Sequence, residues 1–300
     1  MKKILLSLAV AAFAMSALAQ VVNVASVKKV ALPAGVSVDK AVISPQGDFV
    51  VVSDNAVAGL KKIDLATGKS MVISKTASNY DVKISNDGGL ILFREYSVDQ
   101  NHLRWATIKT FSPVAMKEST IVAKSRDIQG TALDGGTVRV VDNGRMKSQR
   151  LYASAIKSAP VPFIDHGKLK LSVDGTTRNL SPQGTAGQSY LWPSISPNGK
   201  NVLYYLVGEG TFICDLNGKN VRAMGNLRAA RWIDDSTIVG MRDEDNGVNI
   251  TKSEVIAKSV ASLREQKLSP AGMIAVYPTA GNKKIAFSTL NGELYLVTLK

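Results

Sequence analysis

Cysteine and histidine are almost missing from this chain of 300 residues, which has one cysteine and two histidines. The single cysteine, Cys214, has no second thiol with which to form a disulfide in the chain, and one thiolate is too few for a zinc-finger site. Two histidines make a His-rich catalytic centre unexpected. No G-x-S-x-G sequence occurs either, so the nucleophile elbow of a serine hydrolase is not supported.

Long apolar runs are also missing, apart from one near the N-terminus at residues 4–13. This run follows MKK and precedes ALA, which gives the charged, apolar and small-residue regions of a secretory signal peptide. It is too short for the roughly 20 apolar residues of a membrane-spanning helix. We therefore expect a signal peptide at residues 1–19 and an exported protein. The periplasm is favoured, with the cell surface or secretion as alternatives.

Acidic residues are outnumbered, since 37 lysines and arginines face 24 aspartates and glutamates. Loss of Lys2 and Lys3 with the signal peptide leaves 35 basic residues and a net charge of +11. In an exported protein this charge favours an envelope protein or an anionic envelope polymer as the partner, rather than nucleic acid. The basic residues are spread along the chain, so the sequence leaves open whether they form a patch.

An internal repeat decides the fold class. The clearest unit, residues 193–219, reads as a strand, an SPNG turn, an alternating strand, a loop and a third strand that ends in DLNG. Residues 41–69 repeat this order with SPQG at the turn. Weaker copies occur at residues 82–93, 131–141, 230–241 and 277–288. Pro, Gly and Asn at these turns allow successive strands to reverse and pair, so the pattern is all-β.

Six units of about 45 residues fit the length of the chain without its signal peptide. We therefore predict a six-bladed β-propeller with four-stranded antiparallel blades, occupying residues 20–300 as a single domain. The long interval between the third and fourth units predicts an insertion at about residues 143–166 in blade three. The strand expected at residues 21–32 has no blade of its own, so we expect it to complete the last blade and close the ring.

The turns SPQG, SNDG and SPNG, with IDLATGK and CDLNGK downstream, resemble the WD40-like (PD40) repeat of TolB-type six-bladed propellers. The resemblance covers essentially the whole chain after residue 19. It implies an exported, ring-shaped envelope protein that holds other envelope proteins. The chain has no room for the separate N-terminal domain of TolB, so the partners of that protein are not carried over.

Polar residues gather in the loops between second and third strands, which share one face of a propeller. Long polar loops on a rigid scaffold are common binding sites. The candidate contact residues in or near these loops are Tyr96, Asp99, Arg145, Lys147, Arg150 and Glu209. Our leading hypothesis is a non-enzymatic exported scaffold that binds a protein or envelope partner through this face, without a cofactor and without a catalytic residue.

The alternative hypothesis is a propeller that binds or processes a small ligand or glycan at its central mouth. Tyr190, Trp192 and Arg231 flank the innermost strands of two units, close to that mouth. Asp243 and Asp245 lie in a DEDNG sequence whose oxygens suit calcium, although Asn-Gly at a hairpin tip is the ordinary interpretation. Calcium is therefore the one metal cofactor that this alternative includes.

Overall fold

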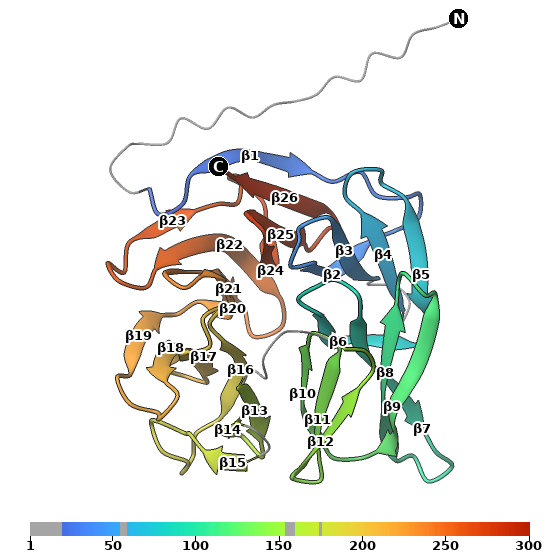
Figure 1. Cartoon of the computed structure of the whole chain (residues 1–300). Helices are drawn as coiled ribbons and strands as arrows, with labels where there is room; N and C mark the ends of the chain where they lie inside the picture. The colour runs from blue at the N-terminus through green and yellow to red at the C-terminus, as the bar shows by residue number, and fades with distance from the viewer. Residues whose placement is uncertain (1–19, 55–58, 154–159, 174–175) are drawn as a thin grey trace, which may run out of the picture.

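The computed structural model describes residues 20–54, 59–153, 160–173 and 176–300. The helices and strands assigned in these residues are all β-strands. The strands form seven separate antiparallel sheets around a central axis (Figure 1). The architecture is therefore a seven-bladed propeller. The all-β propeller expected from the repeats is confirmed, whereas the expected blade number of six is wrong.

Five blades consist of four strands each, which follow one another from the axis outward. Blade 1 contains β2 (Val38–Ile43), β3 (Phe49–Asp54), β4 (Leu60–Asp64) and β5 (Ser70–Ser74), and blade 2 contains β6 (Ala77–Ile84), β7 (Ile91–Val98), β8 (Arg104–Ser112) and β9 (Lys117–Ser125). Blade 5 contains β16 (Tyr190–Ile195), β17 (Asn201–Leu206), β18 (Gly210–Asp215) and β19 (Arg222–Gly225). Blade 6 contains β20 (Arg228–Asp234), β21 (Thr237–Asp245), β22 (Ile250–Ser259) and β23 (Glu265–Lys267). Blade 7 contains β24 (Ala275–Gly281), β25 (Lys284–Thr289), β26 (Leu294–Leu299) and β1 (Val24–Lys29).

Blades 3 and 4 have three strands each, which corrects the expectation of four-stranded blades throughout. Blade 3 contains β10 (Ile128–Asp134), β11 (Thr137–Asp142) and β12 (Arg145–Arg150), and blade 4 contains β13 (Val161–Asp165), β14 (Lys168–Val173) and β15 (Thr176–Asn179). The insertion expected at residues 143–166 is therefore the outer strand of one blade and the inner strand of the next. Its residues 154–159 lie outside the described part. In the sequence, the interval that these two short blades occupy resembles one longer blade with an insertion.

The Ser-x-x-Gly turns of the clear repeats join the first and second strands of their blades. The N–H of Ser44 donates to the carbonyl of Phe49, and the N–H of Gly47 donates to the carbonyl of Ser44, both over 2.9 Å. Gly47 and Gly199 have φ values of 70° and 72°, in the left-handed region that favours glycine. The turn residues recognised in the sequence thus set the reversal between these strands.

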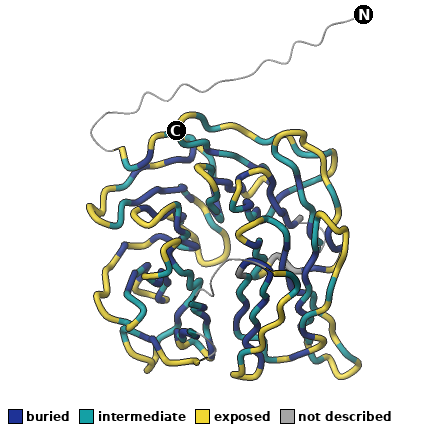
Figure 2. The backbone as a smooth tube through the Cα atoms, viewed as in Figure 1, coloured by how far each residue is buried: buried dark blue, intermediate teal, exposed yellow. Residues whose placement is uncertain are grey.

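Apolar side chains fill the spaces between neighbouring blades. Val50 and Ile63 of blade 1 pack in one cluster with Ala286 and Leu294 of blade 7. Second strands of the blades, such as β3 and β25, are consequently among the most buried parts of the chain, while the outer loops are exposed (Figure 2). A blade cannot cover its own two faces, so burial between blades fixes their radial arrangement.

The N-terminal strand closes the ring, as the sequence predicts. β1 pairs antiparallel with β26, with Val27 opposite Val297 and Lys29 opposite Tyr295, so the first and last strands lie side by side (Figure 1). The seam between blades 7 and 1 has its own hydrogen bonds. The hydroxyl of Thr279 accepts from the N–H of Ile43 and donates to the carbonyl of Ala41, each over 3.1 Å.

The predicted signal peptide at residues 1–19 lies outside the described part of the chain. Among the residues that are described, no helix has the length and apolar character needed to cross a bilayer.

Replacing Gly281 by Ala tests the seam between blades 7 and 1. An added Cβ would lie 2.1 Å from the carbonyl oxygen of Ser44, so the two blades would have to separate. Overpacking of this kind costs about 1–3 kcal/mol, and we expect the free energy of unfolding in urea to fall by that amount. Val114→Ala is the control, because Val114 is 88% exposed and its loss changes little. Equal stability of the two variants would show that the seam is not closely packed.

Candidate functional site

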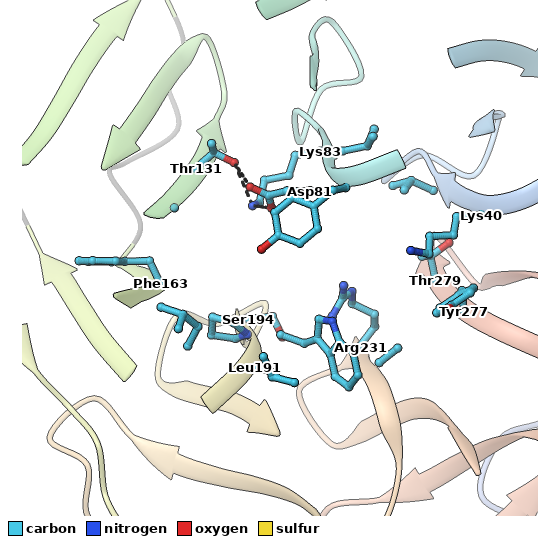
Figure 3. A pocket seen from close by; sticks show the side chains of 18 of the residues that line it. Lys40, Asp81, Lys83, Thr131, Phe163, Leu191, Ser194, Arg231, Tyr277 and Thr279 are labelled. Carbon is cyan, nitrogen blue, oxygen red and sulfur yellow. Dashed lines mark hydrogen bonds and ion pairs between the residues drawn. The ribbon is translucent and has the colours of Figure 1, made fainter. Parts of the chain in front are cut away.

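A cavity of about 430 Å³ lies on the propeller axis and is the candidate functional site. Residues of the innermost strand of every blade line it, from β2, β6, β10, β13, β16, β20 and β24 (Figure 3). Its side chains therefore come from positions as distant in sequence as Lys40 and Thr279. Pockets of this size, with mixed polar and aromatic walls, are suited to a small ligand or to one group of a larger partner.

The innermost strands are irregular where they border the cavity. In β6, β16, β20 and β24 the pairing register shifts, and each shift contains a non-glycine residue with positive φ. These residues are Asp81 (60°), Trp192 (49°), Ala229 (50°) and Tyr277 (51°). Bulges redirect side chains, and non-glycine residues with positive φ cost about 1–3 kcal/mol each. These four blades therefore present strained backbone at the axial cavity.

Asp81 is the one acidic residue lining this cavity among those described. Its Oδ2 accepts hydrogen bonds from Thr131 Oγ1 at 2.7 Å and from a terminal nitrogen of Arg94 at 3.0 Å, and its Oδ1 accepts one from Lys83 Nζ (Figure 3). Burial by itself raises the pKa of Asp81, but the charges of Lys83 and Arg94 outweigh burial and hold the pKa below its usual value. Asp81 is therefore ionised, and its charge is matched by two cations.

Arg231 is another cation of the cavity wall, and no carboxylate among the described residues pairs with it. Among the described residues, the only hydrogen bond of its guanidinium goes to the carbonyl of Ala230, over 3.0 Å. Burial lowers the pKa of Arg231, against the opposing effect of the Asp81 charge, yet arginine remains charged at any ordinary pH. Because a guanidinium has five N–H donors, most of its hydrogen-bonding capacity is available to an anion.

Aromatic rings stand beside the cations. Lys40 Nζ lies 4.5 Å from the ring centroid of Tyr277, a cation–π distance. Trp192 packs against Tyr205 with 5.3 Å between ring centroids, which fixes the indole at the cavity wall. Tyr80 also lines the cavity. The site therefore offers positive charge next to flat apolar surface.

Comparisons with protein-family models and with curated proteins give no match. Among solved structures, a chain of the mitotic checkpoint complex is similar with a TM-score of 0.62 and 10% identity, over 97% of this chain and 100% of that one. The WD40 repeats of RRP9 are similar with a TM-score of 0.60 and 9% identity, over 94% and 100%. An oligogalacturonate lyase from Vibrio parahaemolyticus gives 0.48 and 13%, over 89% and 79%. The first two likenesses show a β-propeller fold. At such identities they show nothing further.

The propeller brings two of the three residues predicted at its mouth into the cavity. Trp192 and Arg231 line it, from adjacent blades 5 and 6. Tyr190 does not, because its side chain is fully buried in a cluster with Leu171 and Tyr204 between blades 4 and 5. Its hydroxyl donates to the carbonyl of Gly184 over 3.0 Å. Tyr190 and Trp192 are two positions apart and would share a face of a regular strand, so the bulge between Leu191 and Ser194, with a φ of 49° at Trp192, accounts for their different directions.

The residues predicted on the loop-rich face have mostly local partners. The carboxylate of Asp99 accepts from the backbone N–H of Leu103 at 2.9 Å and from Trp105 Nε1 at 2.8 Å, and so shapes its own loop. Tyr96 is covered by Arg104, whose guanidinium carbon lies 3.5 Å from the ring centroid. Glu209 is exposed at a hairpin tip and accepts one long hydrogen bond, 3.4 Å, from Gln188. The structure does not gather these three around one point.

Arg145, Lys147 and Arg150 all lie on β12, the outer strand of blade 3, and are exposed. Lys147 pairs with Asp142 at 2.6 Å. These residues are therefore at the rim of the propeller, away from the axial cavity.

The two residues predicted as calcium ligands have other partners. Asp243, whose side chain is 1% exposed, pairs with Arg228 at 2.5 Å. Asp245 accepts the N–H of Gly247 over 2.9 Å, as expected for a residue that shapes a hairpin turn. Among the described residues, no group of three or more His, Cys, Asp or Glu side chains is placed to hold a metal ion.

The cavity also contains residues that the sequence analysis did not single out, notably Lys40, Asp81, Lys83 and Tyr277. A signal for two of them exists in the repeats. The residue four positions before the turn serine is Lys40 in the first unit, Asp81 in the second and Trp192 in the fourth. Each lines the cavity, so this repeat position predicts a wall residue.

Replacing Asp81 by Asn tests the charge network of the cavity. The change leaves Lys83 and the nearly buried Arg94 without their shared carboxylate, and we expect a loss of about 3 kcal/mol in the free energy of unfolding at pH 7. The folded-state pKa of Asp81 is lowered, so its contribution is complete above the unfolded value of about 4 and is lost as the pH falls through the folded value.

Urea unfolding of wild type and Asp81→Asn as a function of pH measures this contribution. The difference between the two proteins should be constant at neutral pH and shrink below about pH 4. A difference that stays the same down to pH 2, or that grows on acidification, would rule out an ionised Asp81 as its source.

Proposed function

We propose that this protein is a non-enzymatic binding propeller whose axial cavity receives an anionic group of its ligand or partner. The observation that carries the proposal is Arg231, a cation on the cavity wall whose guanidinium has no carboxylate partner among the described residues. Arg231 is half-buried, and a partly desolvated charge without a counterion is costly, so a site of this kind favours an anion that supplies the missing charge.

The rest of the wall supports the same class of ligand. Lys40, Lys83 and Arg231 bring three positive charges to the cavity, and Asp81 brings the single negative charge among its described lining residues. Trp192 and Tyr277 add ring surfaces on which a planar or cyclic part of the ligand can pack. The strained positions of these two residues are consistent with a binding site, because strain persists where structure is held for function.

The proposal includes export and an envelope partner. The signal-peptide pattern of residues 1–19 and the resemblance of the repeats to those of TolB-type propellers support export, with the periplasm as the favoured compartment. The net charge of +11 that remains after residue 19 supports an acidic envelope protein or an anionic envelope polymer as the partner. Either would present the carboxylate or phosphate that the axial cavity suits.

Titration with benzoate and with inorganic phosphate tests the axial site. Benzoate combines a carboxylate with a ring, so we expect it to raise the melting temperature and to bind with measurable heat. Arg231→Gln should weaken this binding at least about tenfold, because the charged hydrogen bonds to the anion are lost. Arg264→Gln is the matched control, since Arg264 is exposed and does not line the cavity.

Phosphate carries charge but no ring, so comparing it with benzoate shows whether the site recognises the charge alone or the ring as well. Binding of benzoate alone would indicate that Trp192 and Tyr277 contribute, while equal binding of both anions would assign the site to charge. No heat and no melting shift with either anion would contradict the proposal, and so would unchanged binding by Arg231→Gln.

A further inference from the structure

Blade 3 ends one strand earlier than the neighbouring blade 2. Its outermost strand, β12, pairs with β11 on one side and has no strand on the other among the described residues. Five of its six residues are exposed. A strand in this position offers unpaired backbone groups to any extended segment that approaches it.

One hydrogen bond shows which backbone N–H groups of β12 point toward β11 and which point away from it. The N–H of Leu151 donates to the carbonyl of Gly136, which continues the β11–β12 ladder, over 2.8 Å. Because successive residues of a strand point their backbone groups to opposite sides, the N–H groups of Met146, Ser148 and Arg150 point away from β11. These are the donors that an added strand would use.

β12 is also the most basic of the outermost strands. It carries Arg145, Lys147 and Arg150 and no acidic residue, whereas each of the other six outermost strands carries at most two basic residues. Positive charge on an edge repels other basic edges and so prevents self-pairing. The same charge favours an acidic strand, since opposite charges on neighbouring strands stabilise their pairing.

Blade 4 is equally short, but the one basic side chain of its outermost strand is bonded to the next blade. Arg178 of β15 donates to the carbonyl of Leu216 at 2.5 Å and to Asn217 Oδ1 at 3.3 Å, which ties β15 to blade 5. No hydrogen bond or ion pair engages the Arg145 guanidinium among the described residues, and that of Arg150 donates only to the nearby carbonyl of Tyr152. The two three-stranded blades therefore differ in whether an arginine of the outermost strand is bonded to a neighbouring blade.

A groove beside β12 extends the positive surface. It has a volume of about 510 Å³, lies between β9 and the β11–β12 hairpin, and is lined by Lys124, Arg126 and Lys147. The one acidic residue lining it among those described, Asp142, is buried and bonded to Ser125 and Lys147. The groove thus adds two exposed cations next to the open edge.

We propose that β12 binds an acidic, extended segment of a partner protein, which pairs with it as the fourth strand of blade 3. The backbone of β12 supplies the hydrogen bonds, and the cations of β12 and of the adjacent groove select glutamate- and aspartate-rich sequences. This site is at the rim of the propeller and is independent of the anion site proposed in the axial cavity.

Fluorescence anisotropy with a labelled Thr-Glu-Thr-Glu-Thr-Glu-Thr-Glu peptide tests the site, with the corresponding Thr-Lys peptide as the comparison. We expect the acidic peptide to bind and the basic peptide not to bind. Ser148→Pro removes one outward N–H and leaves the pairing of β12 with β11 and all charges intact, so it should weaken binding about tenfold or more. Arg145→Glu with Arg150→Glu should weaken it at least as much, and more so at low salt.

Two matched variants control for general effects. Lys168→Glu with Arg264→Glu makes the same change in net charge at exposed positions outside β12 and should leave binding unchanged. Melting curves of all variants check that the propeller is folded. Arg231→Gln should also bind the peptide normally, which separates this site from the axial one.

Each outcome decides between interpretations. Loss of binding in both Ser148→Pro and the β12 charge variant supports strand addition. Normal binding by Ser148→Pro means that charge alone holds the peptide, which overturns strand addition. No binding of the acidic peptide to wild type at millimolar concentration, or equal loss in the Lys168–Arg264 variant, overturns the site itself.

Discussion

The pairing of β1 with β26 is the interaction on which the rest of the structure depends. It places the first and last strands of the chain in one sheet and thereby closes a ring whose inner strands are far apart in sequence. The hydroxyl of Thr279, bonded to the backbone of β2, and the close approach of Gly281 to Ser44 hold the same seam. Because the cavity takes its wall from all seven blades, it exists only while this seam is closed.

A closed ring also explains how the inner strands can carry strain. Asp81, Trp192 and Tyr277 adopt backbone conformations that an isolated strand would avoid. Each contacts a neighbouring blade, through Thr131 for Asp81, Arg228 for Trp192 and Lys40 for Tyr277. Burial between the blades of the closed ring offsets the cost of these conformations. The result is a set of side chains directed at the axis by bulges that regular strands would not have. Rigid placement of Arg231 among these side chains reduces the ordering cost of binding an anion.

The sequence predicted local structure well and the number of blades less well. The SPQG and SPNG turns predicted their hairpins, because a turn depends on residues that are adjacent in sequence. The strand at residues 21–32 predicted ring closure, because it is left over when the other strands are assigned to blades. The blade number could not be read in the same way, because residues 131–141 of blade 3 match the repeat whereas blade 4 resembles part of the same unit. Trp192 and Arg231 could be placed near the axis from the repeats, whereas the partnership of Asp81 with Arg94 and Thr131 joins residues up to 50 positions apart.

The location of charge separates the two proposed sites physically. Arg231 is half-buried in the cavity wall, where the effective dielectric constant is lower than in bulk water and salt screens less, so a few cations are enough to favour an anion. The cations of β12 are exposed, and each contributes little at physiological ionic strength. Useful affinity at the rim therefore requires several charges together with backbone hydrogen bonds, which an extended acidic segment supplies and a small anion does not. The same basic composition thus favours a compact ligand at the axis and a strand-like one at the edge.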